Sequence, residues 1–258
     1  MRQLSERGKL LLIISVANIK GGVGKTSVSV FLAQALANMN KAVLVVDIDH
    51  NNNLTDYFLR NVERETLREN NIMHAIKGDK KLEEVIYSWE NLFVCPATPA
   101  LAIIGKQLKE QYEKTINDFS ASLRSLKYDV IIIDTPPALV LELDLALNSS
   151  DMVLVPLSSN RWSVIGYEPL AYELAAINQK RHIKKQIKVL GLPAIVTEKE
   201  AEFLQQHEKE IQLPFAKQAI HRNISIKNAT TQATKINPSV KVWGDFVALA
   251  EEILTYAT

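Results

Sequence analysis

A glycine-rich stretch near the N-terminus constrains this chain more than any other feature of its sequence. Residues 18–27 read Asn-Ile-Lys-Gly-Gly-Val-Gly-Lys-Thr-Ser, between the apolar run 10–16 and a helical pattern that begins near Ser27. A strand that leads through a glycine-rich turn into a helix N-terminus brings backbone N–H groups and the positive end of the helix around one anion. The order of these features therefore predicts a phosphate-binding loop.

The residue types in this stretch suit phosphate and metal binding. Glycines let the backbone come close to phosphate oxygens, Lys25 adds a positive charge, and Thr26 supplies a hydroxyl that can ligate Mg²⁺. We therefore expect the nucleotide-binding residues to be Lys20, Gly21, Gly22, Val23, Gly24, Lys25, Thr26 and Ser27. The alternative is a glycine-rich loop with two surface lysines, which would not require strand, loop, lysine, hydroxyl and helix to occur in this order.

Two aspartates, Asp47 and Asp49, stand at the end of the second apolar run, residues 42–48. In a strand, residues i and i+2 project from the same face, so both carboxylates are expected to approach the phosphate loop if the strand lies beside it. The alternative is a pair of aspartates that cap a turn, where aspartate is common.

A third carboxylate, Asp134, ends the apolar run 128–133 and is followed by Thr-Pro-Pro. An acidic residue after four aliphatic residues is the Walker B arrangement, in which the carboxylate binds Mg²⁺ or its water ligands. The two prolines stiffen the loop that would sense the terminal phosphate. A simple turn at the end of a strand is the alternative, because Asp and Pro both favour turns.

The composition is typical of a compact enzyme of the cytoplasm. The 258 residues are 47% hydrophobic and 23% charged, which is enough to bury a core in one α/β domain spanning residues 1–258. Cys95 is the only cysteine, which excludes a disulfide framework and any iron–sulfur site within one chain; we expect it to be buried. The apolar runs are shorter than a transmembrane helix, and the segment 1–9 is too short for a signal sequence, so a soluble protein is expected.

Strand-like and helix-like patterns alternate along the chain. Strands are expected at 10–17, 42–48, 91–95, 128–133, 152–157, 187–196 and 215–220, and helices at 27–38, 107–126, 168–178, 198–211 and 242–256. The polar segment 61–81 is interpreted as a mobile excursion. Several strands are apolar without alternation, which is the pattern of strands covered on both faces. The fold class is therefore predicted to be α/β, with a doubly wound, mostly parallel sheet and its site at the carboxyl ends of the strands.

The run Lys-Gly-Gly-Val-Gly-Lys-Thr at residues 20–26 resembles the signature of the ParA/MinD family of deviant-Walker P-loop ATPases. Asp-Thr-Pro-Pro at 134–137 matches the same family residue for residue. The resemblance implies a P-loop NTPase topology, ATP and Mg²⁺ as cofactors, Lys20, Lys25 and Asp49 as catalytic residues, and Thr26, Asp47 and Asp134 around the metal. In this family the first lysine, here Lys20, reaches the phosphates of the other subunit of a sandwich homodimer, and the residue at Asp49 positions the attacking water.

Two segments resemble the family but depart from it. Residues 47–53 read Asp-Ile-Asp-His-Asn-Asn-Asn where the family has Asp-x-Asp-Pro-Gln-Gly-Asn. Residues 220–226 read Ile-His-Arg-Asn-Ile-Ser-Ile where the family has Ile-Pro-Arg-Asn-Val-Arg-Leu. Ser225 therefore replaces an arginine that the family associates with DNA contact.

Positive charge gathers at residues 180–188, which contain Lys180, Arg181, Lys184 and Lys185 and no acidic residue. Together with Arg222 these are the candidate DNA contacts, and phosphate contact alone would give binding that is independent of sequence and sensitive to salt. The alternative is a solvated charged surface, since most charge runs are of that kind.

The combined interpretation is a small ParA-type ATPase for chromosome or plasmid partition. ATP would close a homodimer on nonspecific DNA, and a ParB-like partner would stimulate hydrolysis, in the cytoplasm on the nucleoid. No membrane contact is expected, because residues 242–258 carry no Lys or Arg for a basic amphipathic helix. The alternatives are a ParA-like positioning ATPase for another cargo and, in a different class, a P-loop small-molecule kinase or ligase.

Overall fold

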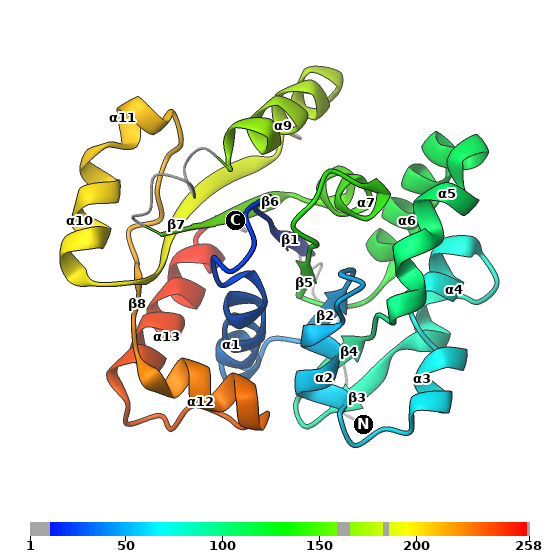
Figure 1. Ribbon diagram of the computed structural model, residues 1–258, viewed down its shortest axis with the longest axis horizontal. Coiled ribbons are helices and arrows are strands. Elements are labelled where there is room, and N and C mark those ends of the chain that lie inside the picture. Colours follow the sequence, from blue (N-terminus) through cyan, green and yellow to red (C-terminus); the bar gives the residue numbers. More distant parts are fainter. Residues whose placement is uncertain (1–10, 159–165, 183–185, 257–258) are drawn as a thin grey trace.

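The computed structural model describes residues 11–158, 166–182 and 186–256. Within them, eight strands form one sheet in the order β3-β4-β2-β5-β1-β6-β7-β8, in which β3 is antiparallel to β4 and every other pairing is parallel (Figure 1). The strands are β1 Leu12–Val16, β2 Val43–Asp47, β3 Tyr87–Trp89, β4 Leu92–Cys95, β5 Val130–Asp134, β6 Met152–Leu157, β7 Lys188–Val196 and β8 Ile220–His221. The predicted α/β class with a mostly parallel sheet is confirmed.

The four central strands β2, β5, β1 and β6 are buried at every position. Their aliphatic side chains therefore pack on both faces of the sheet, which explains why the sequence shows apolar runs without alternation. Cys95, at the end of β4, is also buried and behaves as a small apolar residue, as predicted.

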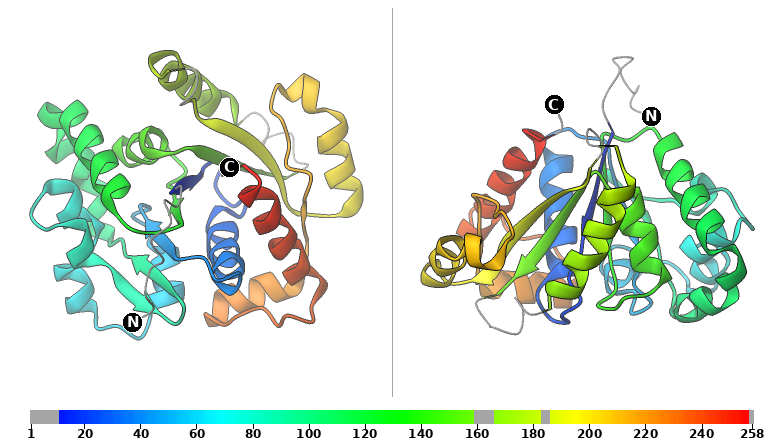
Figure 2. Two further views of the ribbon diagram at one scale, coloured as in Figure 1. Left: turned by 180° about the vertical axis from the view of Figure 1, so that it is seen from behind. Right: turned by 90° about the horizontal axis from the view of Figure 1, so that it is seen from above.

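Helices cover both faces of the sheet (Figure 2, right). The described α-helices are α1 Lys25–Asn38, α2 Asn53–Leu59, α3 Arg64–Glu69, α4 Ile72–Lys77, α5 Ile104–Gln107, α6 Tyr112–Ser125, α7 Leu141–Ser149, α9 Glu168–Lys180, α10 Glu198–Gln206, α11 Glu208–Ile211, α12 Ile224–Gln232 and α13 Lys241–Leu254. Short 3₁₀ segments are η1 Leu82–Val85, η2 Pro99–Ile103 and η3 Lys109–Gln111. Among these described helices, none is both long and apolar enough to cross a bilayer.

The apolar side chains divide the helices between the two faces. One hydrophobic cluster joins α1, α2, α12 and α13 to the sheet, and α1 lies directly against α13. Two further clusters join α4, α5, α6 and α7, and then α7, α9 and α10, to the opposite face. The described helices therefore cover both faces of the sheet, and only the two ends of its strands are left without one of these helices packed over them.

Side-chain caps fix where several helices begin. Thr197 accepts from the backbone N–H of Glu200, and the Glu200 carboxylate accepts from the N–H of Thr197 at 2.7 Å, which is a capping box at the start of α10. The Asn223 side chain accepts from the N–H of Ser225 at 2.9 Å at the start of α12. These two caps fix the first residues of α10, which follows β7, and of α12, which follows β8.

The structure differs from the predicted elements in several places. The helix predicted over 198–211 is divided into α10 and α11, and α2, α7, α12 and β3 were not predicted. The segment 61–81 is not an open excursion, because it contains α3 and α4, and Ile72 and Ile76 are buried in the core. The single helix predicted over 107–126 begins only at Tyr112, after α5 and η3. The strand predicted over 215–220 is reduced to β8 and an isolated bridge between Phe215 and Gly191.

Candidate functional site

The three sequence motifs meet at the carboxyl edge of the sheet. β5 lies between β1 and β2, and its last residue, Asp134, is in register with Val16 of β1 and with Asp47 of β2. The glycine-rich loop follows β1 directly and enters α1 at Lys25. The register of these three strands therefore brings the loop, Asp47 and Asp134 together, as the sequence predicts.

The backbone of the loop requires glycine at two positions. Gly22 and Gly24 have φ angles of +76° and +92°, which side-chain-bearing residues rarely adopt. A Cβ on Gly24 would also lie 2.8 Å from the Cδ1 of Ile195, whereas a Cβ on Gly21 or Gly22 would meet nothing within 4 Å. The loop therefore packs against the end of β7 on one side and is open on the other.

Asn18 anchors the entrance of the loop, and sequence reasoning gave it no role. Its Nδ2 donates to the carbonyl of Pro156 at 2.9 Å, and its Oδ1 accepts from the N–H of Lys20 at 2.9 Å. Asn18 is 1% exposed. It therefore holds the first turn of the loop to the end of β6.

The two lysines of the loop differ in their environment. Lys25 is 7% exposed and its Nζ donates to the carbonyl of Lys20 at 3.1 Å, while the Lys20 side chain is exposed. Burial lowers the pKa of Lys25, and the carboxylates of Asp134 and Asp49 act in the opposite direction. A buried ammonium beside an open loop is suited to an anionic ligand.

A loop that binds phosphate needs backbone N–H groups that are not already bonded to the protein. Among the residues that the structure describes, the N–H groups of Gly21, Gly22, Gly24 and the first three residues of α1 have no protein acceptor. These groups include the first turn of α1, where the helix carries its positive end. Donors of this kind at a helix N-terminus, together with Lys25, fit a phosphate group.

The metal-binding residues predicted from the sequence lie together on the other side of the loop. The Thr26 hydroxyl donates to Oδ2 of Asp134 at 2.7 Å, and the Ser29 hydroxyl donates to Oδ1 of the same carboxylate at 2.9 Å. Burial raises the pKa of Asp134 to about 6, and burial together with the charge of Asp134 raises that of Asp47 to about 8. The buried carboxylates of Asp47 and Asp134 repel one another, and a Mg²⁺ ion beside them would offset that repulsion. Carboxylate and hydroxyl oxygens are also the ligands that Mg²⁺ prefers, so these residues fit the ion. Ser29 was not identified from the sequence.

Asp49 lies beyond β2 and not on it, so the expected projection of both carboxylates from one strand is wrong. The N–H of Asp49 donates to Oδ1 of Asp47 at 3.1 Å, and the carbonyl of Asp49 accepts from the N–H of Asn52 at 2.8 Å. The chain turns here because the Asp47 carboxylate accepts from the N–H of Asp49 and the carbonyl of Asp49 accepts from the N–H of Asn52. Asp49 is 7% exposed, and it remains close enough to Lys25 for its charge to act on that ammonium.

The residues that depart from the family pattern have definite contacts in this turn. Asn51 donates to Oδ1 of Asp49 through its N–H and its Nδ2, both at 2.9 Å. Asn52 has a φ angle of +48°, a conformation that asparagine tolerates better than most other residues with a side chain. The Nδ1 of His50 lies 3.8 Å from Oδ1 of Asp49. The turn is therefore built with asparagines where the resemblance would place Gln and Gly.

The candidate DNA contacts do not gather on one surface. The guanidinium of Arg181 donates to the carbonyl of Ser150 at 2.7 Å, next to the start of β6, so residues 180 and 181 lie at the amino edge of the sheet. Arg222 follows β8 at the carboxyl edge, where its N–H donates to the carbonyl of Val196 at 2.7 Å. Lys184 and Lys185 lie outside the described residues.

A cavity of about 290 Å³ lies between the ends of β7 and β8. Val196, Thr197, His221 and Arg222 are among its lining residues, and Ile195, the neighbour of Val196, contacts Gly24 of the loop.

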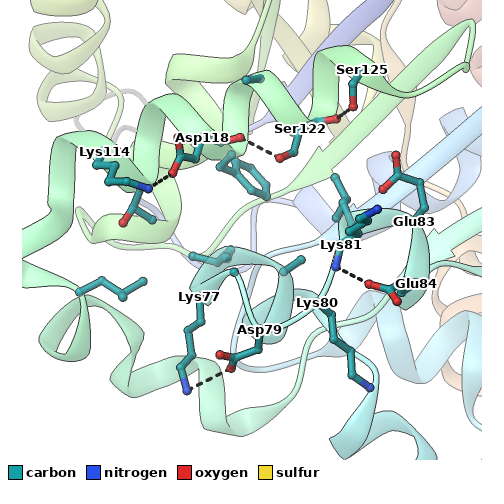
Figure 3. Close-up of a pocket in the computed structure, with 18 of the residues that line it drawn as sticks. Lys77, Asp79, Lys80, Lys81, Glu83, Glu84, Lys114, Asp118, Ser122 and Ser125 are labelled. Carbon is teal, nitrogen blue, oxygen red and sulfur yellow. Dashed lines mark hydrogen bonds and ion pairs between the residues drawn. The ribbon is translucent and has the colours of Figure 1, made fainter.

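A second cavity, of about 810 Å³, lies elsewhere, between α4 and η1 on one side and α6 on the other (Figure 3). Lysines and acids pair within it: the Nζ of Lys77 lies 3.4 Å from Asp79, and Lys114 pairs with Asp118. Because these charges neutralise one another, the cavity is not the candidate nucleotide site.

Known proteins share both the sequence and the fold. A family described as AAA domain matches residues 11–189. The chromosome partitioning protein ParA of Myxococcus xanthus is 30% identical over 222 residues, which cover 83% of this chain and 76% of that protein. The chain belongs to the ParA family of P-loop ATPases.

Solved structures show how widely this ParA-family fold is used. A plasmid partition protein from Borrelia burgdorferi, bound to AMPPNP, superposes with a TM-score of 0.79 at 22% identity, covering 95% of this chain and 99% of that one. A cobyrinic acid a,c-diamide synthase from Mycobacterium smegmatis, with a bound ATP analogue and magnesium, gives a TM-score of 0.80 at 21% identity, covering 95% of each chain. Similarity at this level identifies the fold and does not choose between the two activities.

Proposed function

We propose that this ParA-family chain is an ATP-hydrolysing partition protein that works as an ATP-dependent homodimer. The observation that carries the proposal is the pair of lysines in the loop. Lys25 is buried inside the loop, and Lys20 is exposed directly beside it, where a second subunit could approach. A small-molecule kinase or ligase would have no evident use for a second, exposed lysine at this position.

The described residues divide the work of such a site. The N–H groups of the loop and Lys25 would bind the phosphates, and the base and ribose would extend toward the cavity between β7 and β8. Thr26 and Asp134 would hold Mg²⁺, with Asp47 behind them. The bound ion would neutralise charge on the phosphate oxygens, while Asp49 would orient the attacking water.

Lys20→Ala is expected to remove the ATP-dependent dimer while nucleotide binding persists. The side chain is exposed, so its loss should not disturb the fold, but the contact with the partner subunit's nucleotide would be lost. Size-exclusion chromatography with light scattering in AMPPNP and Mg²⁺ should give a dimer for the wild type and for Lys127→Ala, a control at another exposed lysine, and a monomer for Lys20→Ala. The same molar mass for all three proteins would refute the sandwich dimer.

Nonspecific DNA binding is the second part of the proposal. Lys180 and Arg222 lie at opposite edges of the sheet, so each would contact phosphates separately, and dimer closure would double the number of contacts. Arg181 is a weaker candidate in the folded chain, because its guanidinium donates to carbonyls at the end of α7. A ParB-like partner and a location on the nucleoid in the cytoplasm belong to the same proposal.

Replacing Lys184 and Lys185 by glutamate should reduce the salt dependence of DNA binding. Each phosphate contact contributes about 0.9 to the slope of log affinity against log salt, so the loss of two contacts should flatten the slope by about two. Fluorescence anisotropy with a random-sequence duplex and ATP measures the slope, and Lys106→Glu with Lys109→Glu gives the same charge change at two lysines that the structure shows to be exposed. Equal binding in ADP and ATP, or equal slopes in both double variants, would argue for a ParA-like positioning ATPase with another cargo.

A further inference from the structure

Thr55 is a buried residue in the first turn of α2 to which the sequence motifs gave no role. Its hydroxyl donates to Oδ2 of Asp47 at 2.7 Å, and its backbone N–H donates to the same oxygen at 2.9 Å. The hydroxyl oxygen accepts from the N–H of Ala97, in the loop after β4, also at 2.9 Å. Thr55 is 1% exposed, so water does not compete for these bonds.

These bonds close a ring around the turn that carries Asp49. Oδ1 of Asp47 accepts from the N–H of Asp49, at the start of the turn, and Oδ2 accepts twice from Thr55, just past its end. Asp47 is fully buried at the end of β2 and cannot shift without breaking the pairing of that strand. The turn is therefore clamped at both ends on one fixed carboxylate.

The bond from the N–H of Ala97 ties the hydroxyl of Thr55 to the loop after β4 as well as to β2. Because the hydroxyl donates to Asp47 and accepts from Ala97, its orientation is determined from two sides. Valine has nearly the same shape but would leave one buried carboxylate oxygen short of a donor and one buried N–H without an acceptor. Of the two groups that Thr55 offers to Asp47, only the hydroxyl can be removed by a substitution of the side chain.

We propose that Thr55 is a positioning residue for hydrolysis, which fixes the location of Asp49 through the Asp47 carboxylate without touching the nucleotide. This role rests on the proposed hydrolysis of ATP. Displacing a catalytic group by about 1 Å can slow a reaction about a hundredfold. Loosening the turn should therefore lower the rate of hydrolysis much more than the affinity for nucleotide.

The test uses Thr55→Val, which removes the hydroxyl, and Thr55→Ser, which retains it. Thr115→Val is the matched control, because Thr115 is also buried, at 5% exposure, and its hydroxyl donates to the carbonyl of Gln111 within α6. Calorimetry with AMPPNP and Mg²⁺ measures affinity, and single-turnover phosphate release measures hydrolysis. We expect Thr55→Val to bind within about threefold of wild type and to hydrolyse ATP roughly 10- to 100-fold more slowly, with Thr55→Ser and Thr115→Val close to wild type.

Three results would overturn this role while leaving the ATPase proposal intact. The first is wild-type hydrolysis by Thr55→Val. The second is a Thr55→Ser variant as slow as Thr55→Val, since the hydroxyl would then not be the cause. The third is an equal loss of affinity and rate in Thr55→Val, which would indicate a general structural defect. Absence of hydrolysis by the wild type would instead overturn the proposed function and this role together.

Discussion

Lys25→Ala is expected to reduce the affinity for Mg-ATP by roughly 10- to 150-fold. A charge-assisted hydrogen bond contributes about 1.5–3 kcal/mol, and about 1.4 kcal/mol corresponds to a factor of ten. The ammonium of Lys25 is buried beside the open loop, where its interaction with phosphate would be weakly screened. Its removal would also leave the carboxylates of Asp134 and Asp49 without the nearby charge that offsets them.

The natural control for this variant is the other lysine of the loop. Lys20→Ala removes the same charge from an exposed position, so a single subunit should retain its affinity within about threefold. Calorimetry under conditions that keep both variants monomeric compares the two lysines directly. If Lys25→Ala binds ATP as tightly as Lys20→Ala does, the assignment of this segment as a P-loop fails.

The parts of the site that could be predicted from the sequence are those encoded locally. The loop of residues 20–26 and Asp134 are each contiguous with an apolar strand, so the strand and its end residue are visible together in the sequence. The position of Asp49 was less well predicted. Its turn depends on Asp47 accepting backbone donors, which strand periodicity does not encode.

Asn18, Ser29 and Thr55 could not be identified because each works through a distant partner. Asn18 binds the carbonyl of Pro156, 138 residues away, and Ser29 binds Asp134, 105 residues away. Thr55 accepts from Ala97, 42 residues further along the chain. A single polar residue carries no sign of such a contact until the strand order is known.

The helices α3 and α4 were missed for a different reason. Each has six residues, which is too short for a 3.6-residue period to be recognised and too short to be stable alone. α4 is stabilised by tertiary packing, because Ile72 and Ile76 enter the core and the Asn71 side chain caps its first turn at 3.0 Å from the N–H of Met73. The polar residues of the segment 61–81 therefore indicated a surface location, and they gave no signal for the two short helices within it.

Asp49→Ala is expected to slow ATP hydrolysis by roughly a hundredfold or more and to leave Mg-ATP binding within about threefold of wild type. A group that orients or activates the reacting water typically contributes about 10²- to 10⁴-fold to the rate. The phosphate contacts proposed for the loop and Lys25 do not include Asp49, so the variant should accumulate as an ATP-bound dimer. Asp56→Ala is the matched control, since Asp56 lies on the adjoining helix α2, is exposed and pairs with Arg60 at 2.7 Å.

Single-turnover phosphate release from ATP and Mg²⁺, with protein in excess and no small-molecule acceptor, tests the central claim most directly. We expect the wild type and Asp56→Ala to release phosphate at the same rate and Asp49→Ala to release it at least about a hundredfold more slowly. If the wild type converts ATP to ADP only after an acceptor is supplied, the chain is a kinase or ligase that uses the same fold. Equal rates for the wild type and Asp49→Ala would contradict the assignment of this edge of the sheet as the hydrolytic site.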